Sequence, residues 1–192
     1  MPSACRSIVF ELASPLPPQV QFLMQDFRLM VNRCIRFALE NNLTAQGSLV
    51  KFGQSLAKEY HVNWLHAEIA MTVALSLNKG HRKRLRQGMN CKVPYVFRPF
   101  LRADDGTFHI APETGHIRLS LRNGEWTGFD VKLSDYHIAI INMGRIKQLV
   151  LIGTKAVLVS RRKSPSDIRR QRSSPSTQTS VRSTASRSPP KA

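Results

Sequence analysis

The spacing of the apolar residues changes twice along this chain, and the order of those changes constrains its fold more than any other feature. Residues 7–13 alternate apolar and polar side chains, which is typical of a short strand, and a cluster of prolines ends that pattern. Apolar residues then recur at helical spacing over residues 19–41, 47–60 and 64–86. The sequence therefore predicts an α+β fold in which one strand precedes three helices and the other strands follow them.

The second half of the chain consists of short strand-like segments separated by turns. Residues 93–100 are apolar but contain two prolines, which favours an extended segment at the edge of a sheet. Residues 116–122 alternate regularly between the turn sequences Asp104-Asp105-Gly106 and Asn123-Gly124. Further strands are predicted over residues 107–110, 125–133, 148–152 and 156–160. Residues 134–147 fit a loop or a short helix, and the whole pattern predicts a small antiparallel sheet or barrel.

Positive charge is the strongest functional signal in the sequence. The 192 residues include 29 Lys and Arg against 12 Asp and Glu, a formal net charge of +17. Residues 161–192 hold nine of the basic residues and one acidic residue, and they lack aromatic side chains, so we predict a disordered tail that cannot bury enough apolar surface to order itself. In the remaining chain, no acidic residue occurs between Glu68 and Asp104. Such a charge balance indicates a polyanionic partner.

The candidate nucleic-acid-binding residues are basic side chains in this acid-free stretch and on strand 116–122. They are Lys79, Arg82, Lys83, Arg84, Arg86, Lys92, Arg98, Arg102, Arg118 and Arg122. Arg and Lys neutralise phosphates and release condensed counterions, so binding of this kind depends on salt. The alternative is a solvated helix end, and the lack of neighbouring acids favours binding. Arg118 and Arg122 are expected beside Ser120 on the polar face of their strand, where they would contact a nucleic-acid backbone or simply face solvent.

Three aromatic residues lie among these charges. Tyr95, Phe97 and Phe100 are placed to stack on nucleic-acid bases or, as strand aromatics commonly do, to pack into the core. The sequence leaves both interpretations open.

Several classes of protein are excluded by what the sequence does not contain. No apolar run is long enough for a transmembrane helix, the N-terminus does not resemble a secretory signal, and three unpaired cysteines fit a reducing cytoplasm, so we expect a cytoplasmic chain without a membrane partner. No nucleotide-binding or hydrolase motif occurs. His61, His66 and Glu68 do not share a helical face, which argues against a metal site. We therefore expect no catalytic residue, no metal and no cofactor, and the oligomeric state is left open.

Five segments carry a family resemblance. They are SIVFELAS, RLMVNRCIRFALENN, ALSLNKGHRKRLRQGMNCKVPYVFRPFLR, GHIRLSLRNGEWTGFDVKLSDY and LVLIGTKAVLVS. Their content and order resemble the N-terminal half of the TnpB (OrfB) proteins of insertion sequences, which are RNA-guided DNA nucleases. The resemblance implies a wedge-like β-barrel over residues 6–14 and 89–160, with a three-helix recognition lobe inserted over residues 15–88. It also implies DNA, guide RNA or both as partners, with the basic residues from Lys79 to Lys92 on the nucleic-acid backbone.

The resemblance ends after Ser160. In TnpB proteins a RuvC-like nuclease domain follows, whose three acidic residues hold two metal ions, whereas residues 161–192 are rich in Arg, Ser, Pro and Thr. We hypothesise that this tail is an out-of-frame product and that the chain is a nucleic-acid-binding fragment unable to cut DNA. The alternatives are a non-functional remnant of a transposase-family gene, an independent basic RNA- or DNA-binding module, and a nuclease that recruits its acidic domain from another chain.

Overall fold

The strand predicted alone at the start of the sequence pairs with the last strand that the structure describes. The computed structural model describes residues 5–122 and 124–162. In it, β1 (Cys5–Glu11) runs antiparallel to β7 (Lys155–Arg162) along its full length. Helices and strands between these two elements are therefore inserted between two hydrogen-bonded neighbours. The rest of the predicted tail, residues 163–192, lies outside the described residues, as does Asn123 of the predicted turn.

Within the described residues, seven strands form two antiparallel sheets. The first has the order β1-β7-β6-β2, with β6 spanning Gly144–Ile152 and β2 spanning Phe100–Asp104. The second has the order β3-β4-β5, with bounds Phe108–Ala111, His116–Arg122 and Glu125–Asp130. Six of the predicted strands are thus confirmed, with end residues shifted by up to four positions, and the arrangement is antiparallel. The exception is the extended edge segment predicted over residues 93–100, because β2 begins only at its last residue.

The two sheets do not close into a barrel within the described residues. β2 passes directly into β3 through the turn at residues 105–107, but these two strands do not pair. A single bridge between Leu12 and Val131 links the sheets, together with hydrogen bonds such as Ala13 N to Asp130 O at 2.9 Å. Because strand pairing stops at β2 and β3, the ladder that a closed barrel requires is interrupted.

The three predicted helices are confirmed. α1 spans Pro18–Glu40, α2 spans Val50–Glu59 after a 3₁₀ turn at Gln46–Leu49, and α3 spans Trp64–Arg86. The segment that the sequence left undecided contains a fourth helix, α4 (Asp135–Met143), followed at once by β6. The fold is α+β.

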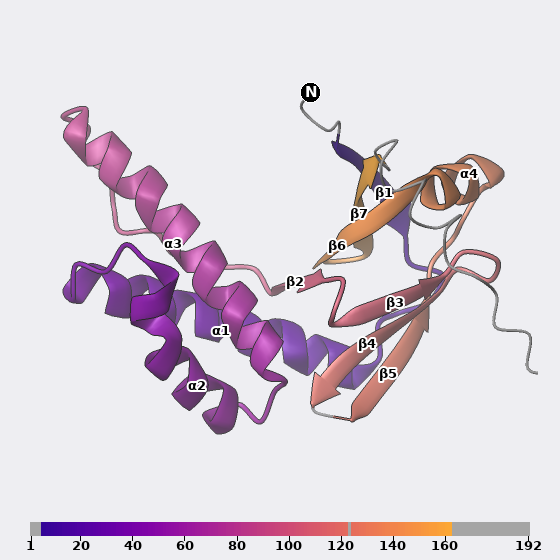
Figure 1. Ribbon diagram of the computed structural model, residues 1–192, viewed down its shortest axis with the longest axis horizontal. Coiled ribbons are helices and arrows are strands. Elements are labelled where there is room, and N and C mark those ends of the chain that lie inside the picture. The colour runs from indigo at the N-terminus through magenta and orange to yellow at the C-terminus, as the bar shows by residue number, and fades with distance from the viewer. Residues whose placement is uncertain (1–4, 123, 163–192) are drawn as a thin grey trace, which may run out of the picture. The chain divides into compact units, whose positions relative to one another are not determined.

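The hydrophobic core joins the helices to the first sheet. α1 buries a continuous face that includes Val20, Phe27 and Cys34, and it packs against both α3 and β2 (Figure 1). α3 presents small residues to α1, among them Ala70 and Ala74, which let the two helix axes approach closely. The consequence is that α3 is fixed along α1, and its C-terminal turns carry their side chains on a defined surface.

Candidate nucleic-acid interface

The C-terminal turns of α3 carry the largest group of candidate residues. Lys79, Lys83 and Arg86 follow one another at intervals of four and three residues, so they share one face of the helix, and all three are exposed. Arg84 is also exposed, on a neighbouring face. Four basic side chains therefore point into solvent from about two turns of helix.

Arg82 has a different role from its neighbours. It is half-buried, and its Nη2 donates a hydrogen bond to the carbonyl oxygen of Ala38 at 3.3 Å, near the end of α1. One turn earlier, the buried Asn78 donates from Nδ2 to the carbonyl oxygen of Ile35 at 3.0 Å. These contacts connect α3 to backbone carbonyls near the end of α1 and hold α3 in place. Arg82 thus anchors the surface and is less available to a ligand.

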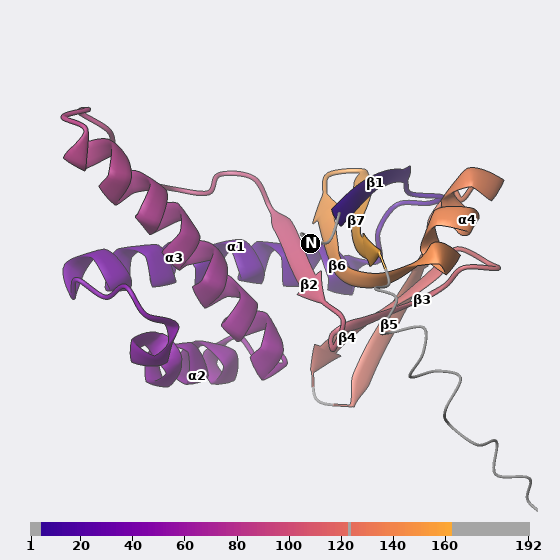
Figure 2. The same cartoon turned by 45° about the horizontal axis from the view of Figure 1, so that its top comes forward.

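Gly88 ends α3, as the sequence predicts. Its φ of +75° is a left-handed conformation that costs glycine little, and the Met89 N–H donates to the carbonyl oxygen of Arg84 at 3.1 Å. The chain then turns back toward the first sheet (Figure 2). We call residues 89–99, which connect α3 to β2, the crossing segment.

The crossing segment is held against α3 and α1 by side chains. The Sγ of Cys91 lies 3.3 Å from Nδ1 of the buried His81 on α3. Further along, the Asn32 side chain on α1 pairs with the backbone of Val96 in both directions: Nδ2 donates to the Val96 carbonyl oxygen at 2.9 Å, and Val96 N–H donates to Oδ1 at 2.8 Å. Arg28 Nη1 donates to the Phe97 carbonyl oxygen at 3.1 Å.

This anchoring explains why most of the apolar stretch over residues 93–100, which was predicted to lie at the edge of a sheet, does not belong to a strand. Exposed and half-buried side chains alternate over residues 93–97, as they do in an extended chain. Residues 93–99 nevertheless pair with no strand among the described residues, and β2 begins only at Phe100. Pro94 and Pro99 offer no backbone N–H, and the backbone groups of Val96 are already satisfied by Asn32. An amide side chain on a helix therefore replaces the neighbouring strand.

The extended conformation separates the side chains of the crossing segment into two sets. Pro94 and Val96 face the protein, whereas Val93, Tyr95 and Phe97 face outward with exposed fractions of 59%, 50% and 76%. The Tyr95 and Phe97 rings lie 4.8 Å apart between centroids, at an interplanar angle of 68°. Two bulky aromatic side chains are thus presented to solvent on the segment that follows the basic end of α3.

Phe100 does not belong to this exposed pair. It packs edge-on against Phe27 of α1, with 5.1 Å between ring centroids. The core interpretation therefore holds for Phe100, while Tyr95 and Phe97 lie outside the core. Lys92 and Arg98, the two basic candidates of the crossing segment, are both exposed.

The candidate residues on the sheets lie in different surroundings. Arg102 on β2 is half-buried, with Nε 3.9 Å from Oδ1 of Asp104. Arg122 at the end of β4 lies 3.8 Å from a carboxylate oxygen of Glu125. Arg118 on β4 lies over the Trp126 ring, 5.7 Å from its centroid. Each of the three already has an interaction partner within the protein.

Ser120 is buried, so the expectation that it shares an exposed polar face with Arg118 and Arg122 is wrong. The N-terminal end of α3 covers it: Asn63 Nδ2 donates to Ser120 Oγ at 3.1 Å, and His66 Nε2 donates to the Ser120 carbonyl oxygen at 2.7 Å. A shift in strand register between Ser120 and Arg122 also interrupts the regular alternation.

Seven of the ten candidate residues lie on the C-terminal turns of α3 and the crossing segment, two lie on β4 and Arg102 lies on β2, so the ten do not line one groove. Arg118 and Arg122 flank the residue that receives the N-terminal end of α3, whereas the basic turns lie at its C-terminal end. At a rise of about 1.5 Å per residue, the two ends of this 23-residue helix are about 35 Å apart.

His66 is buried at the sheet-facing end of α3. Its Nδ1 has no hydrogen-bond partner among the described residues, so a proton there would be a buried donor without an acceptor. Burial accordingly lowers the pKa of His66, against a smaller opposing effect of its bond to Ser120. The imidazole is thus neutral at pH 7, and its role is structural.

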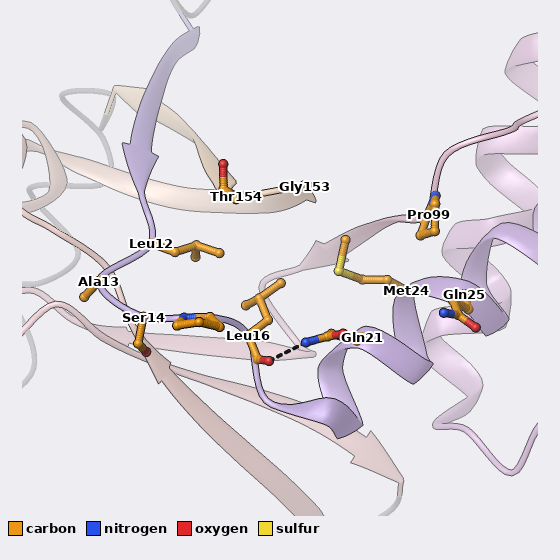
Figure 3. A pocket seen from close by; sticks show the side chains of 11 residues that line it. Leu12, Ala13, Ser14, Leu16, Gln21, Met24, Gln25, Pro99, Gly153 and Thr154 are labelled. Atoms are coloured by element: carbon orange, nitrogen blue, oxygen red, sulfur yellow. Dashed lines mark hydrogen bonds between the residues drawn. The ribbon is translucent and has the colours of Figure 1, made fainter.

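A pocket of about 510 Å³ lies between the start of α1 and the turn between β6 and β7. Leu12, Leu16 and Met24 line it, and Gln21 Nε2 donates to the Leu16 carbonyl oxygen at 2.7 Å (Figure 3). Its lining includes no charged side chain and is mainly apolar. The pocket therefore offers no cationic side chain to a phosphate.

Reactive and metal-binding groups are sparse in the described part of the chain. Burial raises the pKa of the Cys34 thiol to about 12, which makes it a poor nucleophile. Within residues 5–122 and 124–162, no group of three or more His, Cys, Asp or Glu side chains is placed to hold a metal ion.

Comparison of the sequence with protein-family models and with curated proteins gave no match. None of the helices in the described ranges combines the length and the apolarity that crossing a lipid bilayer requires.

Proposed function

We propose that this protein binds nucleic acid through a cationic surface at the end of α3, which we call the α3-end surface. It consists of Lys79, Lys83, Arg84, Arg86, Lys92 and Arg98. All six side chains are exposed, and none takes part in an ion pair among the described residues. This unneutralised set of charges is the observation that carries the proposal.

The physical basis is the release of counterions from a polyphosphate. Six exposed cations on adjoining elements create a local positive potential, and each phosphate that they neutralise frees condensed ions into solution. Binding of this kind has little sequence preference and weakens steeply with salt. The fold contributes rigidity, because Asn78 and Arg82 fix α3 on α1 while Asn32 fixes the crossing segment.

We further propose that the chain corresponds to the nucleic-acid-binding half of a TnpB-like RNA-guided nuclease. The pairing of β1 with β7 across an inserted set of helices supports this assignment, and so does the location of the basic residues on the last inserted helix. In this proposal the two sheets correspond to the wedge-like domain and α1–α3 to the recognition lobe. The ligand is then guide RNA, target DNA or both, and no cleavage step is assigned to the chain.

The experiment is a salt titration of binding. Fluorescence anisotropy with labelled RNA and labelled duplex DNA should give dissociation constants that rise linearly with salt on a logarithmic scale. Six contacts correspond to a slope of about 4 to 5. Affinity that does not change between 50 and 300 mM salt would contradict the proposal, because an electrostatic interface cannot behave in that way.

A second candidate, a non-functional remnant that folds incompletely, is favoured by the outer face of the first sheet. Val9 of β1 and Ile152 of β6 are 53% and 47% exposed there, and the register places the half-buried Val157 and Val150 in one row with Val9. An apolar sheet face of this kind favours association. Concentration-dependent aggregation would support this candidate, whereas a monodisperse protein that unfolds cooperatively would count against it.

A further inference from the structure

The exposure of the two aromatic rings on the crossing segment is not explained by the core. Phe97 is 76% exposed, although removing a phenylalanine side chain from water is among the larger favourable contributions to folding. The neighbouring Tyr95 is half exposed, whereas Pro94 and Val96, the residues that alternate with the two aromatic residues, are only partly exposed. Cationic side chains at Lys92 and Arg98 flank the pair.

The rings are also held in a fixed position. The backbone between them is clamped by the double hydrogen bond from Asn32 to Val96, and the Phe97 carbonyl oxygen accepts a bond from Arg28. Pro94 and Pro99 restrict the chain on either side. Ligand binding would therefore cost little ordering of the backbone, which is a property of a prepared binding surface.

The geometry of the pair points to unpaired bases. Tyr95 and Phe97 are two residues apart in an extended chain, a separation of about 6.5 Å along the backbone. Their ring planes are inclined at 68°. Consecutive bases of a duplex are parallel and enclosed by their neighbours, so they cannot lie on two rings at this angle. Bases of a single strand are free to separate and to stack on aromatic faces.

We propose that Tyr95 and Phe97 form a stacking platform for two unpaired bases of single-stranded nucleic acid, with the phosphates on Lys92, Arg98 and the basic end of α3. This inference rests on the proposed function, which it deepens by naming the strand state of the ligand. The charges near the rings favour nucleic acid over a protein partner. No acidic residue lies between Glu68 and Asp104, so the basic residues before and after the two rings are complemented by the phosphates of a nucleic-acid strand. A 12-nucleotide oligothymidine and a 12-base-pair blunt duplex serve as probes.

The decisive variant is Tyr95→Leu/Phe97→Leu, which keeps apolar side chains and removes the aromatic faces. Single-strand affinity should fall about 100-fold, at about tenfold for each ring, while the salt slope and the duplex affinity stay the same. Tyr95→Trp/Phe97→Trp should restore single-strand affinity. The matched control is Phe22→Leu, which alters a phenylalanine that is 64% exposed on α1 and should bind like the wild type. All variants should unfold at the wild-type temperature, since none of these side chains is buried.

The outcomes separate this inference from the function on which it rests. Unchanged single-strand binding by the leucine variant, or an equal loss on duplex, would overturn the platform while salt-dependent binding by the wild type would leave the proposed function intact. Lack of binding of either probe by the wild type would overturn both. A loss confined to the single strand and reversed by tryptophan supports the platform.

Discussion

Several of the basic residues on the sheets lie beside carboxylates, whereas those at the end of α3 lie beside none in the described part of the chain. The α3-end surface presents six exposed cations, none of which pairs with a carboxylate among the described residues. On the sheets, Arg145 and Lys147 both bind Asp105, with distances of 3.0 and 3.1 Å to Oδ2. Their hydrogen bonds and charges, those of Lys147 first, lower the pKa of Asp105.

This contrast teaches that total charge is a poor guide to where a polyanion binds. A cation with a carboxylate neighbour must exchange that partner for a phosphate, so little is gained, whereas an unpaired cation gains the full interaction. The proposed function therefore rests on the acid-free stretch from residue 69 to residue 103. Predictions that alter one group and leave the other intact test whether the contrast holds.

The largest effect is expected from neutralising the shared face of α3. Lys79→Gln/Lys83→Gln/Arg86→Gln should weaken nucleic-acid binding on the order of 100-fold at 0.1 M salt and lower the salt slope by about 2 to 3. Anisotropy titrations at several salt concentrations measure both quantities. The matched control is Arg118→Gln/Arg122→Gln on β4, and a comparable loss in this control would contradict the contrast between the groups.

A smaller loss of affinity should follow when a carboxylate is placed beside the basic residues of α3, as Asp105 lies beside Arg145 and Lys147 on the sheets. Ser76 is exposed and lies three residues before Lys79 on the same side of the helix. Ser76→Glu should therefore weaken binding about fivefold at low salt, through pairing with Lys79 and repulsion of phosphate. Ser76→Gln has a similar size and no charge, so equal losses in the two variants would show that the helix face acts through shape.

The reverse change on the sheet should give a still smaller effect. Asp105→Asn removes the carboxylate shared by Arg145 and Lys147, which leaves two cations free. Nucleic-acid affinity should rise about two- to threefold at low salt, and the salt slope should increase by about one. Little stability is lost, because both pairs are exposed. A decrease in affinity would contradict the view that this carboxylate neutralises its neighbours.

The smallest effect is a change of stability with pH, and it concerns His66 near the N-terminal end of α3. The pKa of His66 is lower in the folded protein than its ordinary value of 6.5, so below that pH the unfolded chain takes up a proton that the folded protein does not. The free energy of unfolding should therefore fall as the pH decreases below 6.5 and should not change on this account at higher pH. Denaturant unfolding from pH 7.5 to 5.0 measures this dependence. His66→Gln, which keeps a donor for the Ser120 carbonyl oxygen, should show a weaker dependence.

Local sequence patterns predicted most elements of the fold. Helix α3 and strand β4 have the expected bounds because each combines a regular period with a clear end signal, such as Gly88. The lone strand β1 was predicted from alternation alone, but residue spacing does not identify its partner. Pairing between residues far apart in sequence decides whether strands form one barrel or two sheets, and local spacing does not contain that information.

The sequence identified the basic residues of the candidate site, but it did not predict which side chains are buried and which residues hold them in place. The acid-free stretch identified the basic residues of α3, but the burial of Ser120 depends on its contact with Asn63 and His66, which belong to another element. Asn32 was missed as well, because its spacing in α1 is that of an ordinary polar helix residue. The alternation of Pro94 and Val96 with Tyr95 and Phe97 was a usable signal, since it predicts which aromatic side chains face outward.

The union of the first strand with the last has a consequence for how the protein is made. During synthesis β1 is made before the other described elements, but its partner β7 is made after all of them. The helices α1, α2 and α3, in contrast, follow one another in the sequence and can pack together soon after they are made. The helices can therefore assemble early, and the sheet is completed only after release of the final strand. A nascent chain that ends before residue 155 lacks β7, so the backbone groups of β1 that pair with β7 have no strand partner. Unpaired strand edges of this kind favour aggregation and are typical binding sites for chaperones.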